Sequence, residues 1–345
     1  MTNYHSPISS PHEEDAFAPI LDFVRQARGQ ALAAVNRELV ALYWRIGEYL
    51  SHKIAADGWG QGTIKRLADW LVIHEPVIRG YSPQNLWRMR QFHETYREDA
   101  ILSPVVRELS WTHNLVILSK CRSQEERGFY LRLAVQERWT KRELERQLDG
   151  GLFERTLIAK PKLSPALREI HPGAESAFKD GYLIDFLSLP HVHSEHDLQK
   201  GLLANLKQFL LELGREFCFV DEEYLIQVGA KDFFIDLLLY HRGLQALVAF
   251  ELRIDDFKPA YLGQLEFYLE ALDRDHKKPH EAASIGVLLC KSRDHDVVEY
   301  ALSRSLSPTL VAEYVTKLPD KHMLQTKLDE FYELAQYQAR QEREP

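Results

Sequence analysis

The stretch FFIDLLLYHRGLQALVAFELR (residues 233–253) decides the fold of the second half of the chain. Two runs of β-branched, aromatic and other apolar residues, 233–241 and 246–252, are separated by a short turn-like break that contains Arg-Gly. Such runs predict the two strands of a β-hairpin. Each run holds one carboxylate, Asp236 in the first and Glu251 in the second. A carboxylate in so apolar a run requires a partner, because an unpaired buried charge is costly.

The two carboxylates are expected to face each other across the hairpin. If the turn is centred between Gly243 and Leu244, antiparallel pairing sets Asp236 opposite Glu251, with side chains roughly 5 Å apart on one face. Adjacent carboxylates repel each other unless a cation lies between them, and hard divalent ions such as Mg²⁺ or Mn²⁺ prefer oxygen ligands. Arg253 shares the face of Glu251 and would be placed to meet a phosphate group.

A simpler interpretation stays open at this point. Asp236 and Glu251 could be partly exposed residues of edge strands. Their ion-pair partners would then be the nearby cations Arg253, Lys231 and Lys258. Single carboxylates are common enough in strands that the pattern alone does not decide between the two interpretations.

The segments around the hairpin predict an α/β domain with a mixed sheet flanked by helices. The expected elements are a helix over 194–213, strands over 217–220 and 224–228, a helix after Pro259, a strand over 284–290, a helix over 294–303 and a last strand near Leu310. Helices and strands follow one another here without repeats or low-complexity tracts.

In the first half of the chain the apolar residues follow a helical period. Apolar residues recur at three- and four-residue spacings over about 18–155, which predicts an all-α domain. Within it, IRGYSPQNLWRMRQFHETYRE (78–98) is similar to the second helix of a helix-turn-helix, with Ser82 and Pro83 at its start. The side chains that would then contact DNA are Arg79, Asn85, Arg88 and Arg90. The alternative is an ordinary amphipathic helix with its arginines in water.

Composition divides the chain into five segments. They are a disordered lead-in (1–17), the helical domain (18–155), a Pro-rich linker (156–180), the α/β domain (181–320) and a C-terminal helix or tail (321–345). A net charge of -8 would by itself disfavour a nucleic-acid partner. Residues 20–155, however, hold 21 Lys and Arg against 17 Asp and Glu, so the helical half is mildly basic and could bind phosphates.

Other patterns narrow the class of protein. The three cysteines are isolated from one another, which disfavours disulfides and cysteine zinc sites and fits a cytoplasmic location. No apolar run approaches the length of a membrane span, so we expect no membrane partner. A Gly-rich loop ending in GK[ST] is absent from the sequence, so no nucleotide cofactor is expected.

Several of these segments together resemble a known family. Residues 233–273, and IGVLLCKSRDHDVVEYAL (285–302) after them, are similar to the nuclease domain of the YhcG family. That family, also described as the domain-of-unknown-function 1016 family, lies in the PD-(D/E)XK nuclease superfamily. LVALYWRIGEYL (39–50) and ELSWTHNLVIL (108–118) resemble the family's helical N-terminal domain. The resemblance covers about residues 20–320.

This resemblance implies roles for individual positions. Asp236 matches the family's metal-binding Asp, and Glu251 matches the acidic residue of its E-x-K motif. Glu212 falls where the superfamily often carries another acidic residue, and Gln264 falls where it often places a supporting polar group. A Mg²⁺- or Mn²⁺-dependent DNA endonuclease is implied. We also expect a homodimer, since nucleases that cut both strands often work in pairs.

One position departs from the family pattern. The family's Lys is Arg253 here, in Glu251-Leu252-Arg253. The pKa of a Lys can fall on burial until the amine serves as a base, whereas Arg stays protonated and only donates hydrogen bonds and charge. Either Arg253 stabilises the transition state, or Lys231 or Lys258 reaches the site, or cleavage is weakened and the domain serves as a DNA-binding scaffold. A protein-interaction module is the remaining class.

Overall fold

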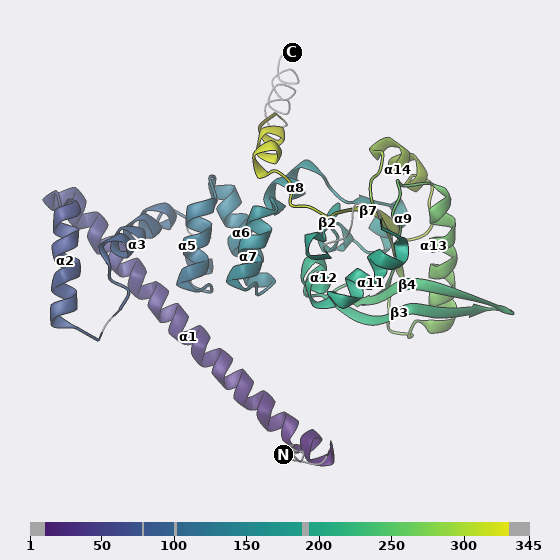
Figure 1. Cartoon of the computed structure of the whole chain (residues 1–345), viewed down its shortest axis with the longest axis horizontal. Helices are drawn as coiled ribbons and strands as arrows, with labels where there is room; N and C mark the ends of the chain where they lie inside the picture. Colours follow the sequence, from purple (N-terminus) through teal and green to yellow (C-terminus); the bar gives the residue numbers. More distant parts are fainter. Residues whose placement is uncertain (1–10, 78, 100–101, 188–192, 331–345) are drawn as a thin grey trace, which may run out of the picture. The chain divides into compact units, whose positions relative to one another are not determined.

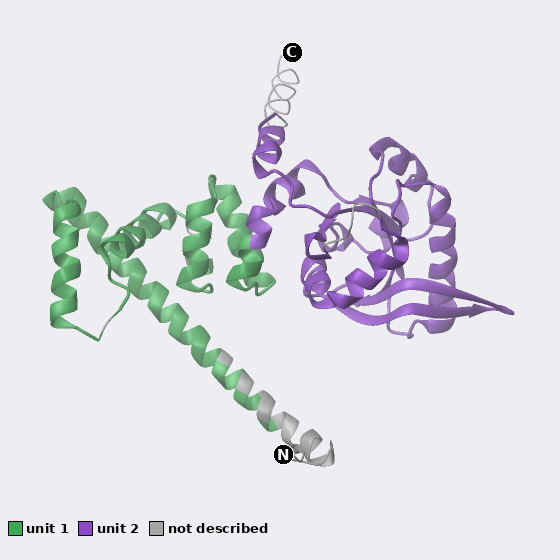
Figure 2. Cartoon of the chain, viewed as in Figure 1, with its two compact units in different colours: residues 1–145 green, residues 146–345 purple. Residues whose placement is uncertain are grey.

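A computed structural model describes residues 11–77, 79–99, 102–187 and 193–330 (Figure 1). The chain divides into two compact units, residues 1–145 and 146–345 (Figure 2). No helix within the described ranges combines the length and the apolarity needed to cross a membrane.

The first unit is helical, as the apolar period predicts. Its helices are α1 (Pro11–Asp57), α2 (Gln61–His74), α3 (Pro83–Tyr96), α4 (Leu102–Val105), α5 (Trp111–Lys120), α6 (Gln124–Gln136) and the larger part of α7 (Lys141–Asp149). The expected lead-in differs from the structure, because residues 11–17 already belong to α1 and residues 1–10 lie outside the described ranges. Pro11 suits a first helical position, where no partner for a backbone N–H is needed.

Helix α3 packs closely along α1. The side chain of Ser82 accepts a hydrogen bond from the backbone N–H of Asn85, and Pro83 occupies the first turn, as predicted. A Cβ on Gly47 of α1 would overlap the carbonyl group of Met89, so only a glycine lets the two backbones approach this closely. The buried face of α3 consists of Leu86, Met89, Phe92, His93 and Tyr96.

The second unit is built on a mixed seven-stranded sheet. Its strands are β1 (Lys162–Leu163), β2 (Gly181–Leu183), β3 (Phe217–Val228), β4 (Lys231–His241), β5 (Ala246–Leu252), β6 (Ile285–Cys290) and β7 (Thr309–Val315). They lie in the order β1-β7-β6-β5-β4-β3, with β2 also paired to β7. Strands β5, β6 and β7 run parallel, whereas β3, β4 and β5 are antiparallel neighbours. The expected mixed sheet is confirmed.

Helices cover both faces of this sheet (Figure 1). They are α9 (Pro165–Ile170), α10 (Ala174–Ala177), α11 (Glu195–Ala204), α12 (Leu206–Leu213), α13 (Ala260–Ala271) and α14 (His295–Leu302), with single turns at Asp185–Leu187 and Leu272–His276. Helix α8 (Leu152–Ile158) precedes β1. One core lies between the sheet and α9, α11 and α12. The other lies between the sheet and α13 and α14. Strand β5, the middle of the sheet, is buried along its whole length.

Three segments differ from expectation. The helix expected over 194–213 is two helices that meet at Asn205, and the two strands expected over 217–228 form one strand with an irregular register after Phe219. The segment 156–180, expected as a linker, holds β1, α9 and α10 and contributes side chains to the core. Its prolines do not mark a loop throughout, since Pro165 begins α9 behind the capping Ser164. Of the expected C-terminal helix or tail (321–345), residues 321–330 are helical and residues 331–345 lie outside the described ranges.

Candidate active site

Strands β4 and β5 bring Asp236 and Glu251 together. The antiparallel register pairs Leu237 with Phe250, and one further step along both strands sets Asp236 opposite Glu251. The turn occupies residues 242–245, so the pairing is the one expected from the sequence. At this point the ladder between the strands ends, because the backbone N–H of Leu252 donates to Asp236 Oδ2 at 2.7 Å.

Glu251 is a buried carboxylate with one oxygen left over. Its residue is 2% exposed, in a central strand rather than an edge strand. Its Oε1 accepts a hydrogen bond from Arg253 Nη2 at 2.6 Å, whereas its Oε2 is buried without a hydrogen-bond partner among the described residues. The alternative of a partly exposed edge residue is therefore wrong for Glu251, although Arg253 is its ion-pair partner.

Burial disfavours the ionisation of both carboxylates. Burial, together with the charge of Asp236, raises the pKa of Glu251 to about 8. Burial also raises the pKa of Asp236, although the hydrogen bond from Leu252 opposes that rise. Although Arg253 opposes the rise, a pKa of about 8 means that Glu251 holds a proton at neutral pH in the metal-free protein.

Arg253 is held firmly beside this pair. Its guanidinium donates to Glu251, to the carbonyl oxygen of Leu252 at 2.7 Å and to Gln264 Oε1 at 3.0 Å. It also lies over the ring of Tyr261, 4.9 Å from the centroid. Burial opposes its charge, yet Glu251 and Glu195 raise the pKa of Arg253 further. The structure thus brings Gln264 to the predicted site and fixes a permanent cation there.

The two lysines proposed as substitutes differ in position. Lys231 begins β4, five residues from Asp236, which is about 16 Å along an extended strand. Lys258 lies much nearer. It pairs with Asp255, and its Nζ is 5.5 Å from the same Tyr261 ring that Arg253 covers. Lys258 therefore lies at the edge of the site, and Lys231 does not.

Glu212 belongs to a different cluster. This fully buried carboxylate on α12 is 2.6 Å from Arg146 Nη2 and 3.1 Å from Lys179 Nζ. Gln147 and the backbone N–H of Leu183 also donate to it. The structure therefore does not bring Glu212 to the predicted catalytic group. Its cationic neighbours keep the carboxylate ionised, because they lower the pKa of Glu212 in spite of burial.

Two residues of α11 approach the site instead. Glu195 Oε2 lies 3.7 Å from Arg253 Nη1, and Gln199 Nε2 donates to the backbone carbonyl of Asp236 at 3.2 Å. Sequence reasoning missed both. The sequence pattern that could have identified them is their four-residue spacing, which places both on one face of the helix that follows the capping Ser194.

Asp236 and Glu251 suit a divalent cation whose remaining ligands are water and substrate phosphate rather than further side chains. No group of three or more His, Cys, Asp and Glu side chains that could hold a metal occurs in the described part of the chain. Mg²⁺, however, commonly uses one or two protein carboxylates together with water and substrate phosphate. The unpartnered Oε2 of Glu251 is a suitable ligand atom.

Comparison with known families agrees with the residue pattern. The family model of the YhcG PDDEXK nuclease domain matches residues 175–329, and that of the DUF1016 N-terminal domain matches residues 19–155. The chain belongs to the YhcG family. It is 28% identical to YhcG of Escherichia coli (strain K12), which is named as a candidate nuclease, over 90% of this chain and 92% of that protein. A crystal structure of a repair endonuclease from Pyrococcus abyssi aligns with 39% of this chain and 50% of that chain, at 16% identity and a TM-score of 0.25.

In the helical domain of this YhcG-family chain, the four predicted DNA contacts are not equivalent. Asn85 donates to the carbonyl of Gly80 and accepts from Trp111 Nε1 at 3.1 Å, so both ends of its amide already bond within the domain. The Nε atom of Arg90 pairs with Glu94 at 2.8 Å. The two exposed members of the predicted set are Arg79 and Arg88. Arg79 also lines a groove of about 970 Å³ between α1, α2 and the start of α3.

Proposed function

We propose that this YhcG-family chain is a divalent-metal-dependent deoxyribonuclease whose reacting phosphate meets Asp236, Glu251 and Arg253. The observation that carries the proposal is the facing pair of carboxylates, of which Glu251 is buried and keeps one oxygen without a partner. Burial raises both pKa values, and the charge of Asp236 raises that of Glu251 further, so a bound cation would relieve the pair. The family and its nuclease-type domain support phosphodiester hydrolysis as the reaction.

The residues around the carboxylates position the phosphate. A Mg²⁺ or Mn²⁺ ion held by Asp236 and Glu251 would supply the charge that polarises a phosphodiester and activates a water. Arg253 remains protonated, so it donates hydrogen bonds to the charge that develops on the phosphate oxygens. Gln264 and the Tyr261 ring keep its guanidinium at that position.

A specific contact favours a weaker second candidate. The Arg253 guanidinium already bonds Glu251 Oε1 and the Leu252 carbonyl oxygen, which are oxygen atoms that a cation would also seek. A cation would therefore have to compete with Arg253. If Arg253 wins, the domain binds DNA without cutting it efficiently and acts as a scaffold.

We assign DNA binding or dimerisation to the helical unit. Exposed Arg79 and Arg88 support phosphate contacts. Residues 20–35 of α1 support dimerisation, because five large apolar side chains described there are between 47% and 67% exposed: Ile20, Phe23, Val24, Leu32 and Val35. Apolar side chains at helical spacing on a long helix are typical of a surface that a second helix covers.

One experiment tests the nuclease proposal directly. The full chain is incubated with plasmid, linear and branched DNA in Mg²⁺, in Mn²⁺ and in EDTA, beside Asp236→Ala and Glu251→Ala. We expect cutting that requires the metal and that both substitutions abolish. Asp232→Ala, an exposed carboxylate of the same strand, is the matched control and should cut normally. Cutting in EDTA, or full activity of both site variants, would contradict the assignment.

A further inference from the structure

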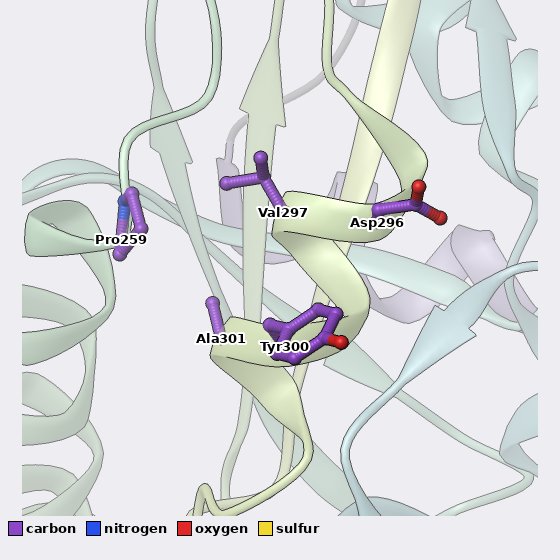
Figure 3. Close-up of a pocket in the computed structure, with 5 residues that line it drawn as sticks. All are labelled: Pro259, Asp296, Val297, Tyr300 and Ala301. Carbon is purple, nitrogen blue, oxygen red and sulfur yellow. The ribbon is translucent and has the colours of Figure 1, made fainter.

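A small apolar groove lies between the start of α13 and helix α14. Its volume is about 510 Å³, and it is lined by Pro259, Asp296, Val297, Tyr300 and Ala301. Figure 3 shows Val297 and Ala301 on the side of α14 toward Pro259, with Tyr300 projecting at the edge. The Tyr300 residue is 83% exposed and Val297 is 42% exposed. An aromatic ring left so open beside a groove is a candidate contact surface.

A short stretch of chain links the catalytic group to the groove. The chain leaves β5 at Leu252, passes Arg253 and reaches Lys258 and Pro259 at the entry to α13. Arg253 and Lys258 lie over one ring, that of Tyr261, at 4.9 and 5.5 Å from its centroid. Lys258, which also pairs with Asp255, is directly followed by Pro259 of the groove. A strand whose phosphate lies beside Arg253 and Lys258 could therefore place a neighbouring base at the groove.

The chemistry of the groove suits a nucleobase better than a phosphate. A base presents a flat apolar face that stacks on aromatic side chains, whatever its sequence. Asp296 is the one charged residue among those that line the groove, and its negative charge disfavours phosphate oxygens there. The phosphates would therefore stay beside Lys258 while the base enters the groove.

The size of the groove favours a single base over a protein partner. Five residues line it, whereas a stable protein interface uses roughly 20 to 30 residues a side. Bases inside a duplex are stacked and paired, so only an unpaired or extruded base can lie on Tyr300.

We propose that this groove, formed by Pro259, Val297, Tyr300 and Ala301, binds an unpaired base of the strand whose phosphate lies at the Asp236–Glu251 site. The substrate class is then single-stranded DNA or DNA with frayed or branched ends. This inference rests on the proposed nuclease function, because it names the substrate of that site.

Binding by the full chain tests the inference, with Asp236→Ala present throughout to prevent cleavage. The probes are a single-stranded oligonucleotide that contains 2-aminopurine and a blunt duplex of the same sequence. Tyr300→Ala should weaken single-strand binding about tenfold or more and abolish the quenching of 2-aminopurine fluorescence, because one base–aromatic stack is lost. Duplex affinity should stay the same. Tyr300→Phe should retain the affinity for the single strand, because the ring remains.

Leu306→Ala is the matched control. Leu306 is 91% exposed just beyond α14 and does not line the groove, so its loss should leave both affinities unchanged. If Tyr300→Ala weakens single-strand and duplex binding equally, or weakens neither, the proposed base binding in the groove is wrong. The nuclease proposal is unaffected by that result. If the chain with native Asp236 neither binds nor cuts any DNA, both proposals fall.

Discussion

Arg253 is a permanent cation beside Asp236 and Glu251. Its three hydrogen bonds and its stack on Tyr261 fix the guanidinium in one place, whereas a lysine would present a single flexible ammonium group. The site therefore has positive charge to offer a phosphate, but this residue cannot take a proton from water.

Substitution of Arg253 separates these roles. If it stabilises charge on the phosphate, Arg253→Ala should lower kcat by about 10²- to 10³-fold, the usual loss when one preorganised donor is removed. Arg253→Lys should retain part of the rate, because charge remains while the two-pronged contact is lost. Steady-state cleavage of a labelled oligonucleotide measures both variants. A gain in kcat with lysine would instead show that the natural site is attenuated.

The raised pKa of Glu251 predicts pH-dependent metal binding. A cation must displace the proton of Glu251, so Mn²⁺ affinity should rise about tenfold per pH unit below the pKa of about 8 and level off above it. In the metal-free protein, the stability that Glu251 contributes is fully present below its unfolded pKa and is lost as pH rises through about 8.

Isothermal titration with Mn²⁺ between pH 6 and pH 9 measures this dependence. Glu251→Gln should bind Mn²⁺ more weakly and with a flatter pH profile, since the titrating ligand is gone. A slope that is unchanged in Glu251→Gln would assign the proton to another group.

Individual residues show what the sequence could reveal. The pairing of Asp236 with Glu251 was predictable, because strand register follows from turn length. The role of Asn85 was not, since its acceptance of a hydrogen bond from Trp111 depends on a helix that begins 26 residues later. Exposed polar residues of a helix are easy to assign to DNA when their partners within the fold are unknown.

Among the elements, it is α11 and not α12 that approaches the carboxylate pair. Glu212 lies on the helix before the sheet, but it points into a buried cluster with Arg146 and Lys179. Glu195, at the start of α11, approaches Arg253. Position along the chain did not distinguish these two glutamates. Their directions depend on the break at Asn205, which a continuous apolar stripe over 194–213 concealed.

Glu212→Gln tests the structural role of this buried cluster. Removal of the carboxylate leaves Arg146 and Lys179 without their shared counter-charge, so the free energy of unfolding should fall by about 3–5 kcal/mol. At temperatures where the variant is folded, kcat should not change. Denaturant unfolding and cleavage assays measure the two effects. Glu216→Gln, an exposed neighbour on the chain, should alter stability by no more than about 0.5 kcal/mol. A lower kcat in folded Glu212→Gln protein would show instead that Glu212 has a role in catalysis.

Across the whole molecule, the net charge of -8 conceals two different halves. The helical residues 20–155 carry more Lys and Arg than Asp and Glu, and the excess of acids lies in the rest of the chain. Two of those acids, Asp236 and Glu251, form the proposed metal site. An acidic total is therefore compatible with a DNA partner, because association depends on local charge.

The salt dependence of DNA affinity tests whether the basic helical unit contacts phosphates. In full chain carrying Asp236→Ala, the double substitution Arg79→Ala and Arg88→Ala should reduce the slope of log affinity against log salt by about 2, because each phosphate contact contributes about 0.9. Fluorescence anisotropy with one duplex across a series of salt concentrations gives the slope. Arg168→Ala, an exposed arginine on α9, is the control and should leave it unchanged. An equal change in the control, or none in the double variant, would remove α3 and the loop before it from the DNA-binding surface.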